Sequence, residues 1–275
     1  MIKLNNIDHF SLDETFLCGQ CFRWEKEADG TFYGVAGSNA AKIYYHDENN
    51  IYLESSNGDL VYWSKYLNFS CDYNEAEKFL SSDEKLKAPI EAGRGIRILR
   101  QELWETIVSF IISANNNIPR IKKIINNMCR LWGEKIEFDG RTFYGFPDPE
   151  RLAKLSLEEL APIRAGFRDK YILDAAKKVA SGEINLSEIE KMGDRAAGDE
   201  LMKIKGVGRK VADCVLLFSL GRHSVFPLDV WTKRIVSDLY GVDEKNIPGF
   251  VFERFKNYSG IAQQYLYYYY AIQKK

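Results

Sequence analysis

Long hydrophobic runs are missing from this sequence of 275 residues. No apolar stretch approaches the roughly 18 residues that a membrane-spanning helix requires. The first residues also lack the apolar core of a secretion signal. We therefore expect a protein with no membrane contact and a cytoplasmic location.

Cysteine and histidine are also scarce, at five and three residues. The cysteines are odd in number and scattered, which argues against structural disulfides. Cys18 and Cys21 have the spacing of a metal-binding pair, but no second pair and no nearby histidine complete a zinc site. No cysteine follows Cys214, which excludes a four-cysteine iron–sulfur loop beyond it. We expect no metal site.

A large excess of charge of either sign is absent too, because the formal net charge is −1. This value argues against a histone-like protein that coats nucleic acid without specificity. Basic residues still form three local clusters that could gather on one face: Arg94, Arg97 and Arg100; Arg120, Lys122 and Lys123; Lys203, Lys205, Arg209 and Lys210. With 45% hydrophobic residues, the chain is typical of a globular protein with two domains or one large domain.

The hydrophobic pattern changes near residue 95. Before this point, short alternating runs between turn residues predict strands over 20–24, 31–36, 42–45 and 51–54, followed by helices through 62–67 and 75–80. After it, the spacing predicts helices over 103–113, 118–132, 149–154, 156–163, 170–181, 186–192, 250–255 and 260–272, with an extended segment over 136–143. We expect an α+β fold: an N-terminal antiparallel β-sheet domain with a few helices over 1–95, then a mostly α-helical, two-part region over 96–275.

The stretch from residue 201 to 236 carries the strongest motif. A short helix runs into the turn Lys205-Gly206-Val207-Gly208, and a second helix begins at Arg209, which predicts a helix-hairpin-helix over about 199–220. The glycines let the backbone approach a phosphate closely, and main-chain N–H groups at the positive end of the second helix can hold the anion. The hairpin alone indicates only DNA binding.

Lys210 and Asp229 add a possible reaction. Lys210 lies in the first turn of the second helix, and Asp229 follows 229 − 210 = 19 residues later, after Pro227. We expect burial and the neighbouring Arg209 cation to lower the pKa of the Lys210 amine and make it more nucleophilic. Asp229 could orient this amine or stabilise positive charge on a sugar ring. On spacing alone, a surface lysine and an aspartate that caps a helix explain the pattern equally well.

Taken together, these segments resemble the signature of the helix-hairpin-helix DNA glycosylases. The match comprises Gly206-Val207-Gly208-Arg209-Lys210, the following Val211-Ala212-Asp213-Cys214, and Val225-Phe226-Pro227-Leu228-Asp229-Val230. Within that superfamily the chain is similar to the 8-oxoguanine DNA glycosylase/lyases. The resemblance implies that Lys210 and Asp229 are catalytic. It also implies that the hairpin binds DNA phosphates through Lys205, Gly206, Val207 and Gly208.

Two loops match the same family. Asn115 begins a run of three asparagines ahead of Arg120, and helix capping alone would explain such a loop. The resemblance implies instead that Asn115 fills the gap left by an extruded base and that Arg120 hydrogen-bonds the opposite base. Phe167 stands where the family has a wedging tyrosine, and Arg168 matches the arginine that recognises the opposite cytosine. A helix that ends at glycine, with a basic cap, is the structural alternative.

The base pocket is expected on the last helix. Gln263 and Tyr267 are four residues apart, so they lie on one helix face. Tyrosine-rich helices usually pack in a core, yet an amide beside an aromatic ring also suits a purine. The resemblance assigns base recognition to these two residues and places Cys214 on the other face of the base. It gives the Gly19 carbonyl the role of acceptor for the N7 hydrogen of 8-oxoguanine; a strand-entry glycine is the alternative.

The resemblance therefore implies a bifunctional DNA glycosylase/AP lyase. It would flip 8-oxoguanine, preferably opposite cytosine, out of duplex DNA and excise it through a Schiff base on Lys210. The alternatives are a glycosylase for another damaged or mispaired base and a non-catalytic DNA-binding protein. We expect a monomer, located with the nucleoid or in a nucleus when bound to DNA, and no cofactor beyond a possible structural monovalent cation at the hairpin. Trp231 departs from the histidine of better-known members.

Overall fold

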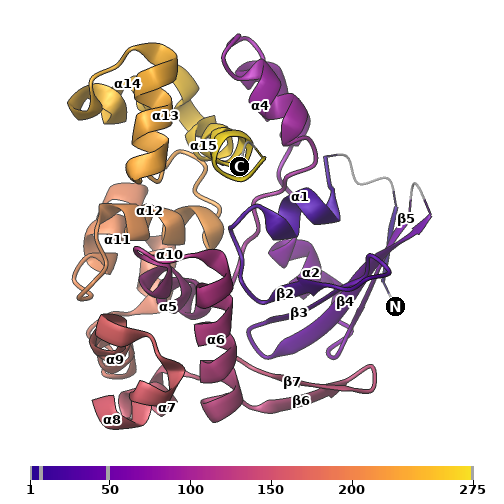
Figure 1. Cartoon of the computed structure of the whole chain (residues 1–275), viewed down its shortest axis with the longest axis vertical. Coiled ribbons are helices and arrows are strands. Elements are labelled where there is room, and N and C mark those ends of the chain that lie inside the picture. The colour runs from indigo at the N-terminus through magenta and orange to yellow at the C-terminus, as the bar shows by residue number, and fades with distance from the viewer. Residues whose placement is uncertain (1, 6–8, 48–49, 274–275) are drawn as a thin grey trace.

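The N-terminal part of the computed structural model is a five-stranded antiparallel sheet. The model describes residues 2–5, 9–47 and 50–273. The strands are β1 (Ile2–Asn5), β2 (Trp24–Lys26), β3 (Phe32–Ala36), β4 (Asn39–Asp47) and β5 (Asn50–Ser55), in the order β1-β5-β4-β3-β2. Figure 1 shows this sheet on one side of the molecule and the helical region on the other.

Helices make up nearly all of the remaining chain. They are α1 (Leu12–Leu17), α2 (Leu60–Tyr66), α3 (Tyr73–Leu80), α4 (Lys87–Ala92), α5 (Leu103–Ser113), α6 (Ile118–Trp132), α7 (Pro149–Ala153), α8 (Leu157–Leu160), α9 (Asp169–Ala180), α10 (Leu186–Lys191), α11 (Asp194–Leu201), α12 (Arg209–Phe218), α13 (Val230–Tyr240), α14 (Ile247–Phe255) and α15 (Ser259–Tyr267). The hairpin β6 (Lys135–Phe138) and β7 (Arg141–Tyr144) extends below the main sheet in Figure 1. Among the described residues, none of the helices has the length and apolar character to cross a membrane.

The expected fold class is confirmed, with local differences. The strand predicted from residue 20 starts only at Trp24, because Gln20 is buried and its side chain caps main-chain groups of Thr15, Arg97 and Leu99 instead of entering a ladder. Helix α1 lies ahead of the first predicted strand, in a segment for which no element was predicted. Its six residues are too few to show a helical period in the sequence. The domain boundary at residue 95 stays a prediction.

Two hydrophobic cores lie side by side. The smaller core joins the sheet to α1 and α2, and the larger one fills the helical region. A buried ion pair crosses from the sheet side to α5, where Nη1 of Arg23 lies 3.1 Å from Oε2 of Glu105. The same carboxylate accepts a hydrogen bond of 3.0 Å from the main-chain nitrogen of Gly37. Helix α5 is thus fixed against the sheet, and its Phe110 reaches the site described next.

Candidate active site

The predicted hairpin is formed by α11, a tight turn and α12. Gly206 in this turn has φ +85°, and a Cβ atom there would lie 2.5 Å from the ring of Tyr171. Both the backbone conformation and the close approach therefore require glycine. The main-chain nitrogen of Lys205 donates to Asp174, which ties the turn to α9. The main-chain nitrogen of Val207 donates to the Ile204 carbonyl at 3.0 Å, and Val207 itself is buried.

The start of α12 has the features of an anion site. Gly208 is its N-cap and provides no side chain to accept from the first-turn N–H groups. A Cβ atom at Gly208 would meet nothing within 4 Å, so the space in front of these groups is open. Arg209 adds positive charge at the surface and pairs with Asp213 at 2.9 Å. This arrangement suits a phosphate; phosphate binding by the hairpin and the cation at its carbonyls remain predictions.

Lys210 lies on the inner side of α12, partly buried. Its Nζ atom is 5.5 Å from the centre of the Phe110 ring, and the buried thiol of Cys214 lies one helical turn further along the same face. Burial raises the pKa of that thiol to about 11, with Lys210 acting in the opposite direction. At physiological pH Cys214 is therefore a neutral thiol, whose sulfur favours the Lys210 cation by accepting a hydrogen bond from it.

The expected lowering of the Lys210 pKa is wrong. Burial does lower it, but Cys214 and Asp229 raise it, and the net direction is upward. Arg209 is not among the groups that shift this pKa, and its guanidinium pairs instead with the buried Asp213, beside Gly198 of α11. The free enzyme therefore holds Lys210 as a cation, and the amine must lose a proton before it can attack.

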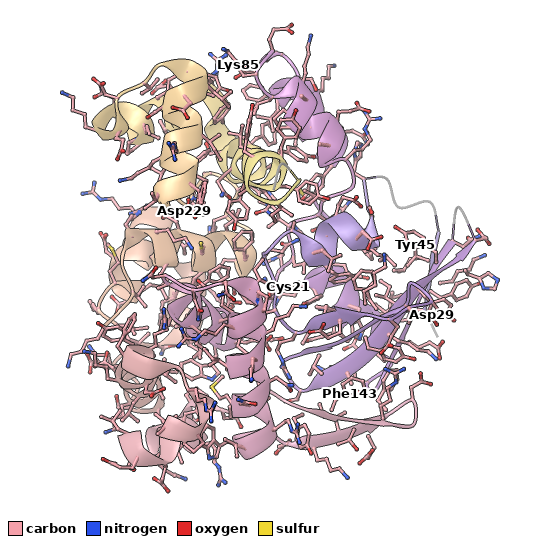
Figure 2. All side chains as sticks on the ribbon, in the orientation of Figure 1. Cys21, Asp29, Tyr45, Lys85, Phe143 and Asp229 are labelled. Carbon is pink, nitrogen blue, oxygen red and sulfur yellow. The ribbon has the colours of Figure 1, made fainter. Side chains whose placement is uncertain are left out.

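Asp229 is the N-cap of α13 and lies between α12 and α13 (Figure 2). Its Oδ1 accepts from the main-chain nitrogen of Thr232 at 2.8 Å and from the Thr232 hydroxyl at 2.9 Å. In the part of the chain that the structure describes, Oδ2 accepts no hydrogen bond. Asp229 therefore does cap α13. The capping hydrogen bonds also hold its carboxylate in place and leave Oδ2 free to act on Lys210 or a bound sugar.

The residues predicted for base recognition come together from opposite ends of the chain. A Cβ atom on Gly19, which has φ +86°, would lie 3.5 Å from Cε1 of Tyr267. The pKa of the Tyr267 hydroxyl is raised, mainly by burial. Asp229 and Cys214 raise it further and Lys210 lowers it, so Tyr267 lies near all three groups. Gln264 supports the Gly19 loop by donating to the Cys18 carbonyl at 3.0 Å.

Gln263 carries an unusual orphaned atom. The side chain is 6% exposed, and its Oε1 has no hydrogen-bond partner within the described structure. Leaving a buried amide oxygen without a partner costs roughly 1–3 kcal/mol. A donor on the pairing edge of a purine would satisfy it.

The asparagine run divides into capping and free residues. Asn117 caps α6 by accepting from the Arg120 nitrogen at 3.0 Å, and Asn116 donates to the Ile112 carbonyl at 3.0 Å. Asn115 is exposed with φ 51°, and its side chain makes no contact of this kind among the described residues. Only the first asparagine is therefore available to enter a duplex.

The two predicted opposite-base arginines differ in burial. Arg168 is 2% exposed, and its guanidinium donates to the carbonyls of Ala114, Asn115 and Ala165. Arg120 is exposed, and within the described residues its side chain donates a single long hydrogen bond, of 3.5 Å, to the Arg164 carbonyl. Phe167 is 54% exposed beside them, with the Arg168 guanidinium 4.3 Å from its ring centre.

Family models match along the chain in the same order. The model described as 8-oxoguanine DNA glycosylase, N-terminal domain, covers residues 1–107, and that of the HhH-GPD superfamily base excision DNA repair proteins covers residues 108–259. The N-glycosylase/DNA lyase OGG1 of Arabidopsis thaliana is 31% identical, over 97% of this chain and 78% of its own length. The chain belongs to the 8-oxoguanine DNA glycosylase/lyase family.

Two solved structures match this chain along nearly its whole length. The Clostridium acetobutylicum 8-oxoguanine glycosylase/lyase, in complex with double-stranded DNA containing cytosine opposite 8-oxoguanine, is 39% identical with a TM-score of 0.94, covering 99% of this chain and 96% of that chain. MBOgg1 in complex with a low-affinity DNA ligand is 46% identical with a TM-score of 0.93, covering 99% and 96%. The protein is an N-glycosylase/DNA lyase of the HhH-GPD superfamily.

Sequence reasoning missed two parts of this glycosylase site. Phe110 lies under the Lys210 amine but sits in an apolar helix, where nothing distinguishes it from a core residue. Thr232 fixes Asp229, and the spacing of a capping box, three residues after the cap, could have revealed it. Trp231 is 51% exposed in the first turn of α13, two residues after Asp229.

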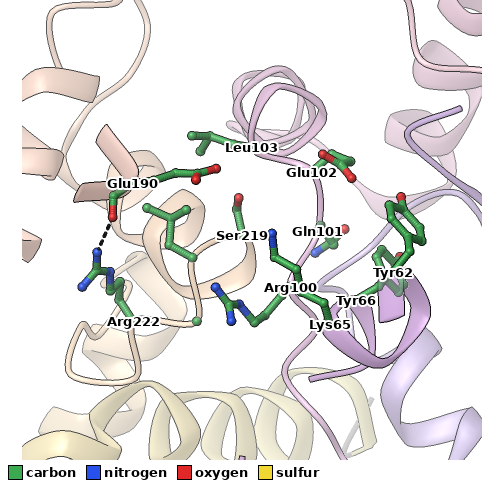
Figure 3. Close-up of a pocket in the computed structure, with 12 residues that line it drawn as sticks. Tyr62, Lys65, Tyr66, Arg100, Gln101, Glu102, Leu103, Glu190, Ser219 and Arg222 are labelled. Atoms are coloured by element: carbon green, nitrogen blue, oxygen red, sulfur yellow. Dashed lines mark hydrogen bonds between the residues drawn. The ribbon is translucent and has the colours of Figure 1, made fainter. Parts of the chain in front are cut away.

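A separate cavity of about 400 Å³ lies between α2 and the C-terminal end of α12 (Figure 3). Lys65, Arg100 and Ser219 are among its lining residues, and Arg222 donates to the Glu190 carbonyl at one side. None of the residues predicted for catalysis or base recognition lines it. This cavity therefore lies apart from the predicted site.

Proposed function

We propose that this enzyme extrudes 8-oxoguanine paired with cytosine from duplex DNA, cleaves its glycosidic bond with Lys210, and then nicks the strand. The main support is the assembly of Lys210, Asp229, Cys214, Tyr267 and Gly19 around one site. The hairpin anchors the damaged strand through phosphates at the start of α12. Because one chain contributes every part, a single copy acts, in whichever compartment holds the DNA.

Extrusion is needed because the glycosidic carbon is inaccessible inside the base stack. Asn115 enters the vacated space, and Phe167 wedges the neighbouring step. Arg120 donates to the pairing edge of the orphaned cytosine, since most of its donors are free in the unbound protein. Arg168 has four of its five donors occupied by main-chain carbonyls, so it holds the Asn115 loop in place and offers at most one bond to the cytosine.

The flipped base lies between Cys214 and Tyr267. Gln263 reads its pairing edge and gains a partner for the orphaned Oε1. The Gly19 carbonyl accepts no hydrogen bond from the described residues, so it can accept the N7 hydrogen of 8-oxoguanine. Guanine has only a lone pair at N7, which would face this carbonyl oxygen and repel it.

The chemistry begins when Lys210 loses a proton. The neutral amine attacks C1′, the glycosidic bond breaks, and its electron pair leaves with the base, which takes up a proton. Asp229 stabilises the positive charge on the sugar as the bond breaks. Opening of the sugar ring gives a protonated Schiff base between Lys210 and C1′. Loss of a C2′ proton then expels the 3′ phosphate and cleaves the strand.

Borohydride trapping tests this proposal. Wild-type enzyme with duplex containing 8-oxoguanine opposite cytosine should give a covalent complex, because the reagent reduces the Schiff base to a stable amine. Lys210→Gln should give none. Lys205→Gln is the matched control: it removes a lysine of the same hairpin whose side chain is 74% exposed, and should trap like wild type at saturating DNA. The lysine mechanism is wrong if Lys210→Gln traps as well as wild type.

A panel of duplexes tests the substrate. The enzyme should process 8-oxoguanine faster than guanine, 3-methyladenine or a mispaired adenine, and faster opposite cytosine than opposite adenine. Equal rates for 8-oxoguanine and an alkylated base would assign the pocket to another lesion.

A further inference from the structure

Arg164 has a backbone conformation that arginine rarely adopts. It follows the short 3₁₀ helix Ala161–Ile163 with φ 60° and ψ 36°, in the left-handed region that favours glycine. Its side chain is exposed, so no packing explains the choice of a large residue here. A strained residue that persists beside a functional loop points to a role in that function.

The position of Arg164 links it to the opposite-base loop. Its carbonyl oxygen accepts the 3.5 Å hydrogen bond from Nη2 of Arg120. Two residues later, Gly166 starts the turn that presents Phe167. The backbone of Arg164 therefore helps to direct the guanidinium that is proposed to read the orphaned cytosine.

Among the described residues, the guanidinium of Arg164 makes no ion pair and no side-chain hydrogen bond. The main chain of Arg164 contacts Arg120 through the 3.5 Å hydrogen bond, and Arg120 contributes, after burial, to the lowered pKa of Arg168. This part of the surface therefore already holds two cations that repel each other, and a polyanion would relieve that repulsion.

We propose that Arg164 is a further DNA-binding residue, which holds a phosphate of the strand opposite the lesion while its main chain positions Arg120. This inference rests on the proposed function for the location of the opposite strand. An arginine can contact two phosphate oxygens at once, which would fix the register of that strand beside the wedge. The exposed position favours a phosphate over a base edge, since it lies outside the gap that Asn115 and Phe167 would occupy.

Binding measurements on three variants test the role of the side chain. The probe is a duplex with a tetrahydrofuran abasic analogue opposite cytosine, titrated at several salt concentrations. Arg164→Gly and Arg164→Ala should bind several-fold more weakly, and the slope of log affinity against log salt should fall by about 0.9, the value for one phosphate. Arg164→Lys should keep most of the slope. Arg130→Ala, at the far end of α6, is the matched control and should keep both slope and affinity.

The same variants separate binding from backbone strain. Arg164→Gly should melt at a higher temperature than Arg164→Ala, because glycine tolerates the left-handed conformation. If Arg164→Gly is more stable than Arg164→Ala and still binds DNA less tightly than wild type, unfolding does not explain the weaker binding. The proposal is overturned if Arg164→Gly retains wild-type affinity and slope. The abasic duplex carries no base to excise, so this outcome is independent of whether 8-oxoguanine or Lys210 is correctly assigned.

Discussion

Nη2 of Arg168 lies 2.8 Å from the main-chain oxygen of Asn115, which joins the wedge segment to the loop expected to enter the DNA. Replacing Arg168 with alanine removes a buried hydrogen bond to the Ala165 carbonyl and partly buried ones to Ala114 and Asn115. A buried carbonyl left without a donor costs roughly 1–3 kcal/mol, and partly buried ones cost less. We expect Arg168→Ala to lower the free energy of unfolding by about 2 kcal/mol in urea titrations. The DNA affinity of Arg168→Ala should also fall.

Arg120→Ala provides the contrast, because this side chain is exposed and makes one long hydrogen bond. Its free energy of unfolding should change by less than about 0.5 kcal/mol. Its preference for cytosine over adenine opposite 8-oxoguanine should decrease, as measured by single-turnover rates. An equal loss of stability in both variants would contradict the supporting role of Arg168.

The raised pKa of Lys210 predicts a rate that increases with pH. Only the neutral amine attacks, and below its pKa the neutral fraction grows about tenfold per pH unit. Single-turnover excision should therefore rise by up to about tenfold per unit between pH 6 and 8, until another step limits the rate. Because Asp229 contributes to raising this pKa, Asp229→Asn should move the profile to lower pH while slowing the reaction. A flat wild-type profile would argue against an amine that must first lose its proton.

Gly19→Ala should impair lesion discrimination. A methyl group there meets Tyr267 at 3.5 Å and imposes strain at φ +86°, so the carbonyl should turn away from the base. We expect the ratio of kcat/KM for 8-oxoguanine over guanine to fall at least about tenfold, which is 1.4 kcal/mol of discrimination. Gly30→Ala is the control: Gly30 has φ +88° with nothing within 4 Å, so its strain is similar and its pocket effect absent. If both variants keep the wild-type ratio, Gly19 serves only the turn between α1 and β2.

Glu105→Gln should destabilise the junction between the sheet and α5. It leaves the buried Arg23 guanidinium without a counter-charge, which costs about 3 kcal/mol. Asp13→Asn breaks a comparable pair with Lys26 whose side chains are 41% and 39% exposed, so its cost should stay below about 1 kcal/mol. Thermal unfolding of both variants measures the difference. Equal melting temperatures would show that the buried pair contributes no more than the exposed one.

The sequence by itself determined the hairpin, the placement of Lys210 at the start of a helix, and the presence of a helix cap in the asparagine run. These features depend on contacts between residues a few positions apart, which spacing and residue type specify directly. The family signature added the order of the motifs, including Asp229. Helix α1 and the exact start of β2 were not predicted, because the conformation of short elements depends on the residues they pack against.

Only the tertiary structure decided how the site works. Gly19 meets Tyr267 because the last helix packs against the N-terminal loop, a contact between chain ends that no local pattern encodes. The pKa of Lys210 rises rather than falls because folding pairs Arg209 with the buried Asp213 and brings Cys214 and Asp229 to the amine. Charge interactions depend on distance through space, and the sequence specifies distance only along the chain.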